Sequence, residues 1–132
     1  MSGIYGMNIK MAIYGESHGA SIGLVIDGVP PGLQLDLEQI EKEMARRAPG
    51  KNQLSTQRKE SDSFAIQSGF FEGYTTGTPL CVVIKNSDQH SKDYSILKDK
   101  MRPGHADYSG FVRYQGFNDY RGGGHFSGRV TA

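Results

Sequence analysis

The sequence has 132 residues, and it contains little cysteine, no tryptophan and no excess of charge of either sign. Its single cysteine, Cys81, cannot form a disulfide within the chain and is expected to pack as a small apolar residue. No Cys and His residues have the spacing of a zinc site. The 15 Lys and Arg side chains nearly balance the 14 Asp and Glu side chains, which leaves a net charge of +1. We therefore expect no metal and no nucleic-acid partner.

Long hydrophobic runs are also absent. No apolar run approaches the roughly 18 residues that a transmembrane helix requires. The segment Met1–Ile4 lacks the basic and apolar regions of a signal peptide. The sequence thus predicts a soluble, cytoplasmic protein that does not bind a membrane.

Glycine, by contrast, is in excess. It makes up 18 of the 132 residues, about twice its usual share of roughly 7%, with no Gly-X-Y repeat of collagen. Apolar residues account for only 36% of the chain. In a chain with the length of one domain, this composition favours backbone that lies close to a ligand or to other backbone.

Apolar alternation predicts strands over 8–14 and 21–27. A further pair of strands, over 64–73 and 79–85, is expected to form a hairpin through a Thr/Gly turn. The clearest helix is expected over 37–48. The order strand, strand, helix, strand, strand favours an α+β fold with antiparallel sheets over a doubly wound parallel sheet.

The expected helix has a recognisable start. Asp36 is placed to cap it, with Gln39 as the capping-box partner. Its apolar stripe would consist of Leu37, Ile40 and Met44. Weaker patterns indicate a short helix within 86–101 and another over 105–115.

A first candidate site is the glycine-flanked turn Gly15–Gly19, directly after the first strand. It contains Ser17 and His18. An imidazole on such a turn is a candidate proton donor near neutral pH. A nucleophilic Ser-His pair is a weaker interpretation, because adjacent side chains usually point apart. The alternative is a solvated turn residue.

A second candidate is a basic stretch between positions 46 and 59 that contains no acidic residue. Its cations are Arg46, Arg47, Lys51, Arg58 and Lys59. Guanidinium groups match phosphate and carboxylate, so the stretch suits an anion site. A solvated helix end is the alternative.

A third candidate is the segment 102–107, in which Pro and Gly fix a loop that presents Arg102 and His105. Asp107 could instead cap a following helix. A fourth is the segment 121–129, with three consecutive glycines whose amides could approach a phosphate. It is neither a P-loop nor a dinucleotide fingerprint, and a flexible surface loop is the alternative.

Together these four segments place His and Arg next to glycine turns. That arrangement predicts a site for a small polyanion, with imidazoles available for proton transfer. The residues alone do not identify the substrate.

In their order along the chain, these segments resemble the chorismate synthase family. The matching blocks are 15–19, 23–32, 46–50, 56–60, 75–79, 93–94, 102–107 and 119–124. The resemblance covers essentially all of the chain. It implies a lyase of the shikimate pathway of aromatic amino acid biosynthesis, which converts 5-enolpyruvylshikimate 3-phosphate (EPSP) to chorismate by 1,4-anti elimination of phosphate.

The resemblance also implies cofactors and an assembly. The family requires reduced FMN although the reaction has no net redox change, and some members reduce FMN with NADPH. Its members pack helices between two antiparallel sheets in a β-α-β sandwich and form homotetramers.

Residue roles follow from the same resemblance. The proton donors would be His18 and His105. The substrate-binding residues would be Ser17, Arg47, Arg102 and Arg129. The flavin-contacting residues would be His105, His125, Phe126 and Ser127.

The sequence departs from the family in two details and in length. Many members have Arg-Ser-Ser-Ala-Arg after the triple glycine, where this chain has His125–Arg129, and a basic residue where this chain has Gln53. Family members are also substantially longer. We therefore expect residues 1–132 to be the N-terminal part of a single domain, inactive without its C-terminal part. The alternative is a catalytically silent binding or assembly module derived from the same family.

Overall fold

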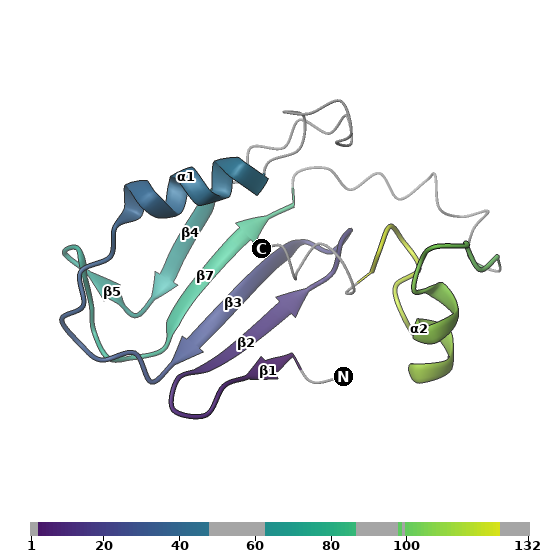
Figure 1. Ribbon diagram of the computed structural model, residues 1–132, viewed down its shortest axis with the longest axis horizontal. Coiled ribbons are helices and arrows are strands. Elements are labelled where there is room, and N and C mark those ends of the chain that lie inside the picture. Colours follow the sequence, from purple (N-terminus) through teal and green to yellow (C-terminus); the bar gives the residue numbers. More distant parts are fainter. Residues whose placement is uncertain (1–2, 48–62, 87–97, 99, 125–132) are drawn as a thin grey trace.

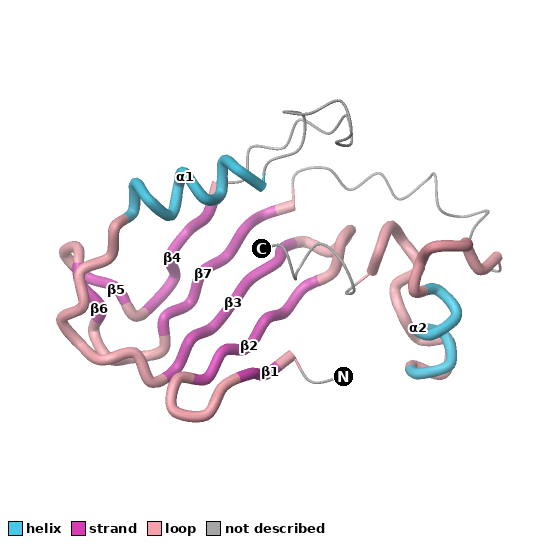
Figure 2. Tube along the Cα trace, viewed as in Figure 1, coloured by secondary structure: helices cyan, strands magenta, loops and turns pink. Residues whose placement is uncertain are grey.

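A five-stranded antiparallel sheet dominates the computed structural model, which describes residues 3–47, 63–86, 98 and 100–124. The strand order is β1-β2-β3-β7-β4 (Figures 1 and 2). The strands are β1 (Ile4–Tyr5), β2 (Lys10–Gly15), β3 (Ser21–Asp27), β4 (Phe64–Ser68) and β7 (Leu80–Lys85). Every described pairing in this sheet is antiparallel, which confirms the expected α+β class.

Three smaller elements complete the described fold. They are helix α1 (Leu37–Arg47), the two-stranded hairpin β5 (Phe70–Phe71) and β6 (Tyr74–Thr75), and helix α2 (Asp107–Arg113). No helix in the described ranges has the length and apolar character needed to cross a membrane.

The sheet buries the apolar face that the sequence pattern predicts. Strand β3 has the predicted bounds 21–27, and its alternate residues pair with those of β7, as in Ile22 opposite Ile84. These two side chains are only 4% and 5% exposed. Cys81 pairs with Val25 and is half-buried. The central pair of strands therefore forms the core of the described fold.

Helix α1 lies along this apolar face (Figure 1). Asp36 caps it as predicted, because its Oδ1 accepts a hydrogen bond from the Gln39 amide at 2.9 Å. The Gln39 side chain instead donates to Glu43 at 3.3 Å, so the expected capping box is only half formed. Ile40 and Met44 face the sheet across an apolar groove of about 490 Å³. Leu37 does not line this groove and is 37% exposed.

The predicted strand over 64–73 is wrong in one respect, because it breaks at Gly69. Gly69 has a φ of +80°, and a Cβ there would lie 2.6 Å from the Leu80 Cα, so only glycine fits. The chain turns there into the β5–β6 hairpin. Strand β4 still pairs antiparallel with β7, as the predicted hairpin requires. The short helix expected within 86–101 lies mostly outside the described residues, whereas α2 confirms the one expected over 105–115.

One end of the sheet is the natural place for a site. Strand β2 ends there, β3 begins there and β7 ends there, and the segment with α2 lies beyond that end (Figure 1). The glycine-flanked turn joins β2 to β3 at this end.

Candidate functional site

The turn between β2 and β3 holds a buried histidine. His18 is only 2% exposed, so the alternative of a solvated turn residue is wrong. Gly15 enters the turn with a φ of +105°, and a Cβ there would lie 2.5 Å from the Ser21 carbonyl oxygen. Only glycine allows the chain to turn this sharply and bring His18 inward.

The triple-glycine segment packs directly on this turn. The Ser17 amide donates to the Gly124 carbonyl at 2.7 Å. Gly122 has a φ of +55°, and a Cβ at this position would lie 2.5 Å from His18 Cε1 and 2.7 Å from Ser17 Oγ. Side chains at Gly122 and Gly124 would clash with the His18 ring and with the Asp119 carbonyl, so both positions require glycine. Residues 122–124 are therefore packed against the turn and are not a free surface loop.

Arg102 ties the third candidate segment to the fourth. Its Nε and Nη2 donate to the two carboxylate oxygens of Asp107 at 2.7 and 2.8 Å. Nη2 also donates to the Gly122 carbonyl at 2.7 Å and to the Tyr120 carbonyl at 3.2 Å. The guanidinium is thus held in one orientation against the backbone that contacts His18.

Asp107 does not cap α2. The capping position is Ala106, which has no side-chain bond, and Asp107 is the first helical residue. Its carboxylate instead accepts from the side chain of Arg102 and from the Arg102 amide at 2.9 Å. The hydrogen bonds from Arg102 hold the pKa of Asp107 below its ordinary value, although burial opposes them.

A second carboxylate lies close to the turn. Asp119 accepts two hydrogen bonds from the Arg121 guanidinium, at 2.8 and 2.7 Å, and its side chain is 10% exposed. Burial alone would raise the pKa of Asp119. The hydrogen bonds and charge of Arg121, together with the charge of His18, outweigh burial and hold this pKa below its ordinary value. Asp119 therefore carries its negative charge beside the turn at neutral pH.

Asn86 is a site residue that the sequence did not reveal. It directly follows β7, and its Nδ2 donates to the carbonyls of Gly19, Glu16 and Ser17 at 2.7, 3.3 and 3.3 Å. The only available signal was a polar residue at the end of an apolar strand. That signal becomes meaningful once the sheet order places the end of β7 beside the start of β3.

His105 has the opposite environment to His18. It is exposed, and its Nδ1 lies 3.3 Å from the Pro103 carbonyl oxygen. Two features shape its loop. Gly104 has a φ of +75°, and the backbone amide of His105 donates a hydrogen bond to the Arg102 carbonyl. The structure therefore links a buried and an exposed imidazole through the contacts of Arg102.

The basic stretch is largely outside the described residues. Arg46 is exposed and pairs with Glu43 at 2.6 Å, and Arg47 ends α1. The other members of that stretch, the side chain of Arg47, and the predicted site residues His125, Phe126, Ser127 and Arg129 lie outside the described part. The structure thus brings together the first, third and fourth candidate segments and does not test the second.

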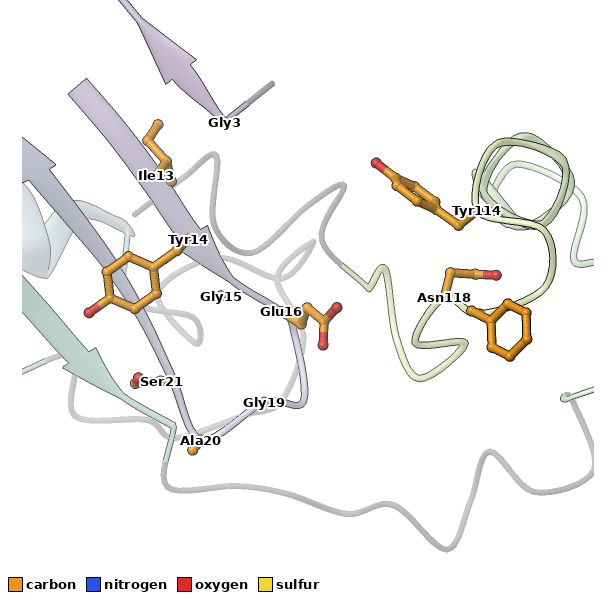
Figure 3. Close-up of a pocket in the computed structure, with 11 residues that line it drawn as sticks. Gly3, Ile13, Tyr14, Gly15, Glu16, Gly19, Ala20, Ser21, Tyr114 and Asn118 are labelled. Atoms are coloured by element: carbon orange, nitrogen blue, oxygen red, sulfur yellow. The ribbon is translucent and has the colours of Figure 1, made fainter. Parts of the chain in front are cut away.

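An open pocket of about 600 Å³ borders the turn on another side (Figure 3). Tyr14 and Glu16 lie on the sheet side of it, and Tyr114 and Asn118 come from the segment after α2 (Figure 3). No Lys or Arg is among its described lining residues. The described lining of this pocket therefore does not favour the binding of a polyanion.

Comparison with known proteins finds similar sequences over nearly the whole chain. A family model described as chorismate synthase matches residues 9–132. The chorismate synthase of Cytophaga hutchinsonii is 50% identical over 131 residues, which are 99% of this chain and 36% of that protein. The chorismate synthase of Pyrococcus abyssi is 52% identical over 128 residues, which are 96% of this chain and 35% of that protein.

A solved structure is similar as well. A crystal structure of chorismate synthase superimposes with a TM-score of 0.55 and 29% identity, covering 83% of this chain and 26% of that one. The chain spans about a third of the length of the relatives that it matches.

Proposed function

The chain belongs to the chorismate synthase family, and we propose that residues 1–132 form the N-terminal part of a single chorismate synthase domain. In the proposed reaction, EPSP loses phosphate by 1,4-anti elimination and gives chorismate. The observation that carries the proposal is the convergence of His18, Arg102 and Gly122 at one end of the sheet. A polyanionic substrate requires cations and proton donors in one place, and Arg102 and His18 would supply them in this proposal.

His18 and His105 are the proposed proton donors. His18 is buried in the turn, and the triple-glycine segment packs against its ring. The exposed His105 is available to a bound molecule at the surface of its loop. The two proposed donors thus differ in burial, since His18 is enclosed and His105 is open to solvent.

Four residues are proposed to bind the substrate anions. They are Ser17, Arg47, Arg102 and Arg129. Arg102 has the best supported position, because its guanidinium is already ordered by Asp107 and by two carbonyls. An ordered guanidinium loses little side-chain entropy when an anion binds.

Reduced FMN is the proposed cofactor, with NADPH as a candidate reductant for it. His105, His125, Phe126 and Ser127 would hold it. Among the described residues, His105 is exposed on its loop and is therefore accessible to a bound cofactor. The chemistry that reduced FMN would supply here is transient electron donation and assistance in removing the ring proton.

The proposal extends to the whole protein. We infer that the sheet and α1 belong to a β-α-β sandwich in a cytoplasmic homotetramer, in which the apolar groove under α1 is closed by further helices. The second candidate function is a catalytically silent binding or assembly module. The observation that favours it is that the guanidiniums of Arg102 and Arg121, in the described part of the site, are already paired with carboxylates.

A flavin titration and a chimera separate the two candidates. In the chimera, residues 1–132 replace the matching segment of the Cytophaga hutchinsonii chorismate synthase. We expect this chimera to bind reduced FMN and turn over EPSP under anaerobic conditions, and the chain alone to do neither. Tight FMN binding and turnover by the chain alone would refute the silent module, while a folded, flavin-bound but inactive chimera would refute the proposed function.

A further inference from the structure

We propose that Asn86 is a positioning residue of this site. It holds the turn that carries Ser17 and His18 in the orientation onto which the triple-glycine segment packs. The inference rests on the proposed function for the roles of Ser17 and His18, but its evidence and its test concern the turn alone.

The geometry is a single side chain that contacts the turn from one end to the other. Asn86 Nδ2 donates to the carbonyls of Gly19 at 2.7 Å, Glu16 at 3.3 Å and Ser17 at 3.3 Å. The Asn86 backbone amide donates to the Ala20 carbonyl at 3.2 Å. Asn86 directly follows β7 and lies 66 to 70 positions further along the chain than its partners, so this is a tertiary contact and not a property of the turn sequence.

The site demands a hydrogen-bond donor with the shape of asparagine. A carboxamide nitrogen carries two hydrogens, so the three carbonyls share them. An aspartate has the same size but would place a negative oxygen against three carbonyl oxygens. An alanine would leave the carbonyls without this donor.

The opposite side of the turn has little tolerance for movement. There, the Ser17 amide is bonded to Gly124 at 2.7 Å, and a Cβ on Gly122 would lie 2.5 Å from the His18 ring. Arg102 in turn fixes Gly122 through its carbonyl. Asn86 and Arg102 thus hold the turn and its covering loop from two sides, and Asn86 acts on the two site residues only through their backbone.

The test compares Asn86→Ala and Asn86→Asp with the unmodified chimera described above, by NMR on selectively labelled protein. We expect the Ser17 amide to exchange with solvent about tenfold faster in both variants, while an interior amide of β3, Leu24, changes by less than about threefold. The nuclear Overhauser contact between His18 Hε1 and Gly122 Hα should weaken or disappear. Asn8→Asp adds the same charge at an exposed asparagine and should leave all three signals unchanged.

Several outcomes would overturn the inference. One is an unchanged Ser17 amide in both variants. Another is equal acceleration at Ser17 and Leu24, which would make Asn86 merely a residue of general stability. Retention of the His18–Gly122 contact in Asn86→Asp would show that side-chain size suffices. If both variants fail to fold, the unmodified chimera decides, because a freely rotating Asn86 amide without an Overhauser contact to Gly19 would also refute the proposal. None of these signals depends on catalysis, so an inactive chimera would leave the inference standing.

Discussion

His18 occupies the space that a side chain on residue 122 would fill. A Cβ on Gly122 would lie 2.5 Å from His18 Cε1 and 2.7 Å from His18 Nδ1. The imidazole is 2% exposed and cannot move aside into solvent. One glycine thereby joins two segments that lie more than a hundred positions apart in the sequence.

Gly122→Ala should therefore destabilise the chain. Overpacking against His18 should cost about 1–3 kcal/mol, beyond the roughly 1–2 kcal/mol that any non-glycine residue incurs at a positive φ. The measurement is the free energy of unfolding in urea. The matched control is Gly73→Ala, since Gly73 also has a positive φ, +90°, but nothing lies within 4 Å of its Cβ position. Equal losses in the two variants would show that the His18 contact contributes nothing.

The Arg102–Asp107 pair should give the chain a measurable acid sensitivity. The folded state lowers the pKa of Asp107 from 3.8. The free energy that the Arg102–Asp107 pair adds to folding is therefore fully present above pH 3.8. It is lost as the pH falls through the lowered pKa of the folded state. We expect Asp107→Asn to cost about 1.5–3 kcal/mol at neutral pH. The difference from wild type should shrink progressively below about pH 4. Urea unfolding at a series of pH values measures it, and a difference that is independent of pH would contradict the ion pair.

Thr75 should anchor the β5–β6 hairpin to the loop between β3 and α1, which contains Pro30 and Leu33. Its side chain is 5% exposed, and its Oγ1 donates to the Pro30 carbonyl at 2.7 Å and accepts from the Leu33 amide at 2.9 Å. Thr75→Val keeps the shape and loses both bonds, so we expect a loss of about 1–3 kcal/mol in thermal or urea unfolding. Thr78→Val, at an exposed position, is the control and should change stability by less than about 0.5 kcal/mol.

The sequence pattern predicted those elements that depend on local spacing. Alternation of Ile22, Leu24 and Ile26 predicted β3 with its observed bounds, because one face of that strand is buried against α1. Asp36 marked the start of α1 for an equally local reason, since a carboxylate can reach an amide three residues ahead.

The rest depended on contacts between distant segments. The break at Gly69 is set by the approach of Leu80, and the bonds of Asn86 reach back to Glu16. Asp107 had a suitable position for a helix cap, but the Arg102 guanidinium gives its carboxylate a stronger partner than a backbone amide does. No periodicity in one stretch of sequence reports on partners in another.

His105→Ala should separate catalysis from folding. His105 is exposed, so its removal should change the free energy of unfolding by less than about 0.5 kcal/mol. As a general acid it should contribute roughly 10²–10⁴ to turnover in the chimera. His18→Ala, by contrast, should lower both stability and turnover, because it empties a buried position. A His105→Ala chimera with unchanged turnover would remove His105 from the proposed proton donors.

Phosphate release from EPSP by the chimera is the most direct test of the proposed function. The assay is run anaerobically with reduced FMN, and the His105→Ala chimera is measured beside it. We predict phosphate and chorismate in equal amounts from the unmodified chimera, and a rate lower by roughly 10²–10⁴ from the variant. A chimera that folds and binds reduced FMN but releases no phosphate would contradict the assignment of this chain to a chorismate synthase active site.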